Sequence, residues 1–227
     1  LDNKKLAAEK LASKEKEEAI TQTRLLALLE KASVQEQQLT TNKEVIDELF
    51  QTYQLISLIK NQHSKVTQGL ENIKNVYLAM IKEQLLEQNL LSATKILQKK
   101  LRLFPELENA AHILSIKSEI NMLNQVTEFL TQAGTHLTNN NLSGVDDNNA
   151  HALYNKVLAI APNNKKAKKG IVNISDKYHH NANELAKNKQ YQKALQQIEV
   201  GENIHPESAI KFSALRDDIN KKIKEHE

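Results

Sequence analysis

The sequence predicts an all-α protein made of two tandem copies of one helical unit. Only five glycines and three prolines occur in 227 residues, whereas a sheet protein needs many tight turns and therefore many of these residues. Leu, Ala, Lys, Glu and Gln are abundant, and all of them favour helices. The segment GLENIKNVY, which begins at Gly69, returns as GIVNISDKY at Gly170, 101 residues later. Helix is therefore the expected state of most of the chain.

Residues 1–22 form the first expected element, a charged helical arm or linker. The segment DNKKLAAEKLASKEKEEA, from Asp2 to Ala19, is rich in Ala, Glu and Lys and contains no Gly or Pro. Leu6 and Leu11 are its only large apolar side chains, so helix propensity and weak side-chain pairs would have to stabilise it. A solvated arm leading into the repeats is the preferred interpretation. A coiled-coil stalk below an upstream membrane anchor is the alternative.

Residues 23–123 and 124–227 are the two expected copies of the repeat. Residues 65–118 align with residues 166–219 without a gap, and identities are about three times as frequent as chance would give. In both copies the apolar residues recur at steps of three and four, which places them on one helix face. The ten identical pairs are Lys65/Lys166, Gly69/Gly170, Asn72/Asn173, Ile73/Ile174, Tyr77/Tyr178, Glu83/Glu184, Ala93/Ala194, Pro105/Pro206, Glu106/Glu207 and Leu114/Leu215.

Each copy is expected to contain two helical hairpins and a trailing helix. The opening part of the first copy is the most degenerate, and its match to the second copy rests on pattern. Leu25–Ala32 lies 101 residues before Val126–Ala133, and Tyr53 lies 101 residues before Tyr154. In the second copy, TNNNLSGVDDNN (Thr138–Asn149) has the Asn, Asp and Gly content of a loop, which we interpret as an insertion.

The three prolines connect these copies to a known helical motif. Each proline stands twelve residues after an alanine, and a larger packing residue follows each alanine at the fourth position. A small residue lets two helices approach closely, the larger residue fills the interface, and the proline ends the helix. The three sets are Ala93, Leu97 and Pro105; Ala150, Tyr154 and Pro162; and Ala194, Ile198 and Pro206. This pattern resembles the second helix of a tetratricopeptide repeat (TPR).

The TPR resemblance implies antiparallel helical hairpins stacked in a right-handed α-solenoid that binds a protein or peptide. The chain departs from the family at its third small position, where Lys100, Val157 and Gly201 replace the usual alanine. The arrangement also resembles helical-repeat segments of bacterial membrane-anchored envelope proteins. That resemblance implies a periplasmic or cell-envelope location, with the cytoplasm as the alternative. The chain begins with Leu1, so an upstream anchor removed from it would be compatible with this expectation.

Composition gives no reason to expect nucleic acid, membrane insertion or cysteine chemistry. Thirty-one basic and 28 acidic side chains are interspersed, with a formal net charge of +3, whereas a nucleic-acid binder usually gathers its charge on one face. No run approaches the roughly 18 consecutive apolar residues of a membrane span. The absence of cysteine excludes disulfides and thiolate metal sites.

No catalytic, cofactor-binding or metal-binding residue is predicted, and the chain is not expected to be an enzyme. The histidines form no His-x3-His pair and no H-E-x-x-H motif, so surface positions are expected for them. Asp146/Asp147 and Asp217/Asp218 are sequence neighbours without the converging geometry of an acid–base pair. No P-loop or G-x-S-x-G motif occurs. The histidines are His63, His112, His136, His151, His179, His180, His205 and His226.

Two further features have both a structural and a functional interpretation. KKAKK (Lys165–Lys169) could contact nucleic acid or an anionic membrane, but a solvated helix face is the preferred interpretation. The tyrosines are expected to pack between helices rather than to stack on bases. A protein or peptide scaffold is therefore the leading functional hypothesis, with a self-associating structural element as the alternative. The residues that bind the partner are not identified by the sequence. The tyrosines are Tyr53, Tyr77, Tyr154, Tyr178 and Tyr191.

Overall fold

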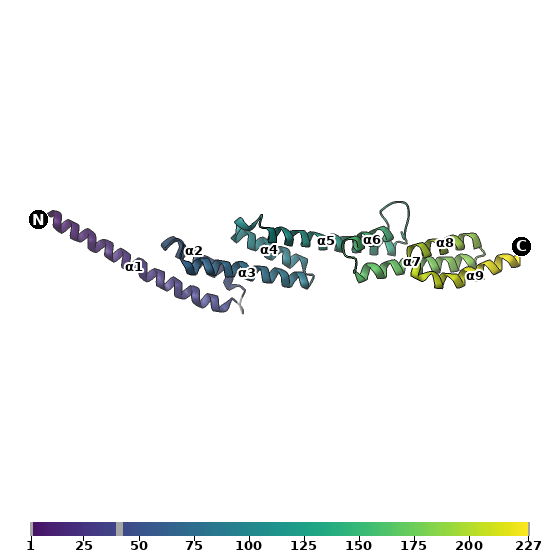
Figure 1. Ribbon diagram of the computed structural model, residues 1–227, viewed down its shortest axis with the longest axis horizontal. Coiled ribbons are helices and arrows are strands. Elements are labelled where there is room, and N and C mark those ends of the chain that lie inside the picture. Colours follow the sequence, from purple (N-terminus) through teal and green to yellow (C-terminus); the bar gives the residue numbers. More distant parts are fainter. Residues whose placement is uncertain (1, 40–42, 227) are drawn as a thin grey trace. The chain divides into compact units, whose positions relative to one another are not determined.

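The computed structural model describes residues 2–39 and 43–226, and the regular structure within these ranges is entirely helical. The all-α prediction is confirmed (Figure 1). The chain separates into two compact units, Leu1–Ala110 (unit 1) and Ala111–Glu227 (unit 2). The α-helices are α1 (Asp2–Gln38), α2 (Val45–Ile59), α3 (Ser64–Leu86), α4 (Leu90–Leu103), α5 (Ala111–Thr138), α6 (Ala150–Ile160), α7 (Lys165–Lys187), α8 (Tyr191–Ile204) and α9 (Ala209–His226). Short 3-10 turns η1 (Pro105–Leu107) and η2 (Pro206–Ser208) follow α4 and α8.

Unit 1 is a series of helices in which each packs against the next: α1 on α2, α2 on α3, and α3 on α4. Its core contains Ile46, Leu49, Tyr53 and Ile73, because the apolar stripes of the first three helices face one another. The helix α1 runs through the predicted arm without a break, and its side chains from Lys4 to Arg24 are all exposed. Burial begins only at Leu25, close to the predicted start of the first copy.

Unit 2 has the same arrangement with one helix more. The helices α5 to α9 each pack against the next, and α7 also contacts α5 and α9. Ala150, Ala167 and Ala194 are buried in its core, where their small side chains let neighbouring helices approach. Phe212 of α9 is completely buried in the same core.

Helix ends follow the local sequence. As predicted, each proline marks a stop: α4, α6 and α8 end two residues before Pro105, Pro162 and Pro206. Asparagine, which is a poor helix former, serves as N-cap where it is placed before a helix. The side-chain oxygens of Asn89, Asn149 and Asn164 accept hydrogen bonds from the backbone N–H groups of Ser92, Ala152 and Ala167.

Several helices of unit 1 have a counterpart in unit 2 that lies a constant number of residues later in the chain. The helices α3 and α7 begin and end 101 residues apart, and the same separation relates α4 to α8 and η1 to η2. The helices α2 and α6 also end 101 residues apart, but α6 starts later, and residues 139–149 form the predicted loop. The last four residues of this loop, 146–149, correspond to the first turn of α2 in unit 1.

The predicted boundary after residue 123 lies within α5, whereas the compact units divide between Ala110 and Ala111. The residues assigned to the trailing helix of the first copy and to the opening helix of the second belong to one uninterrupted helix. No Pro interrupts α5, and Gly134 within it does not end it. The predicted repeat boundary therefore does not coincide with the end of a helix.

The turns after α3 and α7 share a strained residue, which gives a stability prediction. Gln88 and Lys189 have φ values of 58° and 59°, in the left-handed region that favours glycine. Both turns close with the same hydrogen bonds, including Asn89 N–H to Gln84 O at 2.8 Å and Gln190 N–H to Leu185 O at 2.9 Å.

We expect Gln88→Gly and Lys189→Gly each to raise the free energy of unfolding by about 1 kcal/mol, because glycine adopts this conformation without steric strain. Urea denaturation followed by circular dichroism measures the change. Gln98→Gly, at an exposed position inside α4, is the matched control and should lower stability by about 1 kcal/mol. If all three substitutions lower stability, the backbone at Gln88 and Lys189 is not strained.

Candidate partner-binding surfaces

The histidines and paired carboxylates that the sequence offers as candidates lie on several different elements of the described chain. Within residues 2–39 and 43–226, no group of three or more His, Asp or Glu side chains is arranged to hold a metal ion. Over the same residues, no helix combines the length and apolar character needed to cross a membrane. Asp146 and Asp147 lie in the loop before α6, and Asp217 and Asp218 lie on α9.

The histidines are distributed along the chain, and several of them make local contacts. His179 of α7 makes an edge contact with the Phe212 ring of α9, with centroids 5.2 Å apart, and burial followed by the Lys211 charge lowers the pKa of His179. Burial also lowers the pKa of His151 in α6. His205 Nδ1 lies 2.7 Å from Ser208 Oγ at the turn before α9. The side chain of His226 lies outside the described part of the chain.

Four of the five tyrosines are buried between helices, which agrees with the packing interpretation. The Tyr53 hydroxyl donates a hydrogen bond to Glu36, and the Lys65 ammonium lies 3.8 Å from the same carboxylate. The Tyr77 hydroxyl donates to Asp47 at 3.5 Å. Burial, reinforced by these carboxylates, raises the pKa of both phenols well above its usual value, so both stay neutral donors.

A pair of exposed leucines distinguishes the turn between α3 and α4. Leu86 and Leu91 are 87% and 68% exposed, whereas the positions 101 residues later hold Lys187 and Gln192. We call Leu86 and Leu91 the leucine turn. Two apolar side chains exposed on one turn are a candidate contact for a partner, although single exposed leucines are common on protein surfaces.

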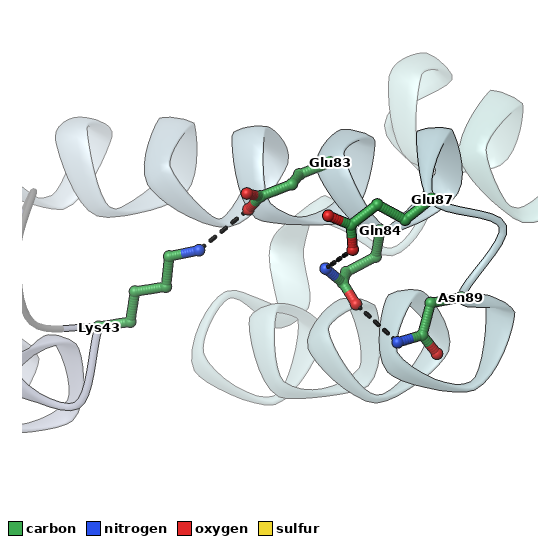
Figure 2. Close-up of polar contacts among 5 residues, drawn as sticks. All are labelled: Lys43, Glu83, Gln84, Glu87 and Asn89. Carbon is green, nitrogen blue, oxygen red and sulfur yellow. Dashed lines mark hydrogen bonds and ion pairs between the residues drawn. The ribbon is translucent and has the colours of Figure 1, made fainter.

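Polar side chains hold the backbone of the leucine turn in place, as Figure 2 shows. Lys43 Nζ lies 3.0 Å from Glu83 Oε2 and joins the segment before α2 to α3. Gln84 Nε2 donates to Glu87 at 2.9 Å, and Asn89 Nδ2 donates to Gln84 Oε1 at 3.0 Å. The bond between Asn89 and Gln84 links the start of α4 to the end of α3 beside the two leucines.

The lysine run at the start of α7 is the second candidate surface. Lys165, Lys166, Lys168 and Lys169 are exposed, and the first turn of α7 contains no acidic residue. Positive charge is unfavourable at a helix N-terminus because of the helix dipole. In α3 the corresponding residues are Ser64, Lys65, Thr67 and Gln68, so unit 2 carries three additional cations at this place.

A buried lysine occupies a position that the sequence singled out only as a departure from the TPR pattern. Lys100 of α4 is 0% exposed, and its Nζ donates a hydrogen bond to the backbone oxygen of Lys74 in α3 at 3.2 Å. Burial lowers its pKa to about 8. In unit 2 the corresponding pair is Ser175 and Gly201, where Ser175 Oγ donates to Gly201 O at 3.1 Å. The helix pair is thus bridged at the same register in both units, by different groups.

Comparison of the chain with protein-family models, with curated proteins and with solved structures finds no match for it.

Proposed function

We propose that this chain is a non-enzymatic helical-repeat scaffold that binds a protein or peptide partner. The fold is proposed to be two TPR-like copies in tandem, stacked as a right-handed α-solenoid. In such an array each hairpin buries only the faces it shares with its neighbours, so a continuous surface stays available for a partner. Recognition on that surface makes and breaks no covalent bond. The sequence resemblance extends the proposal to a periplasmic, membrane-anchored protein.

The observation that carries this proposal is the contrast between packing and surface residues in the two copies. The glycine of α3 and that of α7 each receive a tyrosine from the preceding helix, Tyr53 on Gly69 and Tyr154 on Gly170. Ile73 and Ile174 are equally buried at corresponding positions. The leucine turn and the lysine run, by contrast, have no counterpart in the other copy. These interior contacts are retained, while the leucine turn and the lysine run differ between the two copies.

Exchange variants that transplant surface residues from one copy into the other test this function. Leu86→Lys with Leu91→Gln gives the first copy the residues of the second, and Lys165→Ser, Lys168→Thr and Lys169→Gln make the reverse change. All five residues are exposed, so we expect unfolding free energies to change by less than about 1 kcal/mol. Affinity for a partner that co-purifies with the wild-type chain should fall at least tenfold in one variant.

Two measurements make the outcome decisive. Light scattering over a range of concentrations shows whether the chain self-associates without a partner, which would favour the structural alternative. Circular dichroism shows that each variant is still helical. If both variants bind the co-purified partner as tightly as the wild type, these two surfaces are not the binding surfaces. If no partner is found and the chain stays monomeric, the scaffold function is contradicted.

A further inference from the structure

We propose that the loop formed by residues 139–149, here called the strap, is a pH-responsive device that stays closed on unit 2 while His136 is neutral and opens when its imidazole takes up a second proton. This goes beyond the scaffold function, because it concerns how unit 2 is regulated and not what the protein binds. The last four strap residues correspond to the first turn of α2, and Gln35 stands in unit 1 where His136 stands in unit 2, so the device belongs to unit 2 alone.

The strap is closed by specific contacts with unit 2. Leu142 is buried in the unit 2 core, and Ser143 Oγ lies 2.7 Å from the Tyr178 hydroxyl of α7. The backbone N–H groups of Ala150 and His151 donate to Asn141 O and Leu142 O at 3.1 and 2.9 Å. In unit 1 the first turn of α2 contributes buried Val45 and Ile46, whereas the corresponding residues of unit 2 are exposed Asp146 and Asp147. Leu142 is the strap residue that is buried in this core.

His136, near the end of α5, holds the strap through both ring nitrogens. Its Nε2 lies 3.0 Å from Asn148 Oδ1, and its Nδ1 lies 2.9 Å from Asn141 Nδ2. An amide oxygen can only accept and an amide nitrogen can only donate, so Nε2 carries the proton and Nδ1 accepts. These contacts define the neutral imidazole with its proton on Nε2.

Asn141 cannot adapt to a doubly protonated ring by turning its amide. Its Nδ2 also donates to the backbone oxygen of Asn148, at 2.9 Å. A turned amide would place its oxygen against that carbonyl, and an unturned amide would place its N–H groups against a new Nδ1–H. In either case a hydrogen bond is replaced by repulsion. Proton uptake by His136 therefore opposes the closed strap.

The other titratable groups on the surrounding elements do not supply an equivalent contact. Between Glu128 and its C-terminal end, α5 has no charged residue apart from His136. On the strap itself, Asp147 lies 3.9 Å from Lys156 of α6, and Asp146 is exposed. His151 of α6 contacts Asn155 of its own helix at 3.1 Å, and α7 places Lys177 beside Tyr178. Histidine side chains ordinarily titrate near pH 6.5, well above aspartate. Lowering the pH from 7.5 to 5.5 therefore adds protons to histidine side chains and leaves aspartate side chains charged.

Hydrogen exchange of the whole chain tests the strap, with rates corrected for the intrinsic effect of pH. We expect the backbone amides of Ala150 and His151 to exchange about fivefold faster at pH 5.5 than at pH 7.5, which corresponds to the loss of one hydrogen bond. Helices α2 and α3 of unit 1 should not change, and they provide the internal control. His136→Gln should abolish the pH response, whereas His151→Gln, which changes the neighbouring histidine, should retain it.

If His136→Gln opens the strap at both pH values, its lack of a pH response does not decide the question. Asn141→Asp is then the deciding variant. Its carboxylate can accept a hydrogen bond from the doubly protonated ring, but it also faces the Asn148 carbonyl, which Asn141 Nδ2 binds in the wild type. The strap of this variant should therefore be more open than that of the wild type at pH 7.5, and the pH response should reverse, with slower exchange at pH 5.5 than at pH 7.5. An unchanged exchange rate in the wild type overturns the proposal. So does a pH response that survives in His136→Gln, or acceleration at pH 5.5 in Asn141→Asp.

Discussion

Substituting alanine for Gly69 is expected to lower the free energy of unfolding of unit 1 by about 3 kcal/mol. An added Cβ would overlap the ring and hydroxyl of Tyr53, which is completely buried. The tyrosine cannot withdraw easily, since its hydroxyl is hydrogen-bonded to Glu36 on a third helix. Overpacking of a rigid interior typically lowers stability by about 1 to 3 kcal/mol, and this contact lies at the upper end.

The same substitution at Gly170 should have a similar effect in unit 2, because the added Cβ would overlap the Tyr154 ring. Gly134→Ala is the matched control: it lies inside α5, and no atom lies within 4 Å of the added Cβ. That variant should be more stable by about 0.5 to 1 kcal/mol, since alanine favours the helix over glycine. Urea denaturation gives the three free energies, and hydrogen exchange assigns each change to its unit.

A double-mutant cycle identifies the cause of the loss at Gly69. Tyr53→Leu removes the ring that the new methyl group would meet, so Gly69→Ala should be at least 1 kcal/mol less destabilising in that background. If the two substitutions are additive, the cause lies elsewhere in the helix and not in this contact.

The second large effect is a gain of stability, from replacement of Lys100 by methionine. The ammonium group is fully buried and its hydrogen bond is to a backbone oxygen, so its charge is poorly compensated in the folded state. Its pKa is about 8, compared with an ordinary value of 10.5. That difference corresponds to about 3 kcal/mol, and we expect Lys100→Met to stabilise unit 1 by about 2 to 3 kcal/mol at pH 7.

The pH dependence follows from the same difference. Between about pH 8 and pH 10.5 the unfolded chain holds the Lys100 proton more firmly than the folded chain, so the contribution of Lys100 to wild-type stability should rise with pH across this window. Below pH 8 the group is charged in both states and the full destabilisation remains. Lys100→Met should show no such rise from this site. Lys95→Met, at an exposed position of the same helix, should change stability by less than about 0.5 kcal/mol and should keep the wild-type rise.

If the stability difference between Lys100→Met and the wild type does not shrink between pH 8 and pH 10.5, or if Lys100→Met is destabilising, Lys100 is not buried as a poorly compensated cation. Chemical denaturation at a series of pH values distinguishes these outcomes without reference to any partner.

The sequence by itself determined the features that depend on local signals. The scarcity of Gly and Pro indicated helices, and each of the three prolines correctly located a helix end, because proline lacks the N–H group that a continuing helix needs. The steps of three and four correctly placed Ile73, Ile174, Tyr77 and Tyr178 in the interior. The loop within Thr138–Asn149 followed from its Asn, Asp and Gly content.

Only the tertiary structure decided the features that depend on contacts between distant residues. The sequence marks Gly69 and Gly170 as repeated, but their tyrosine partners lie on the preceding helices and are identified only when the helices pack. Burial of Lys100, and the assignment of His136 to two asparagines of the strap, likewise depend on chain segments that meet after folding. A repeat constrains which residue types recur, whereas the burial and hydrogen bonding of each one depend on the atoms that other helices place around it.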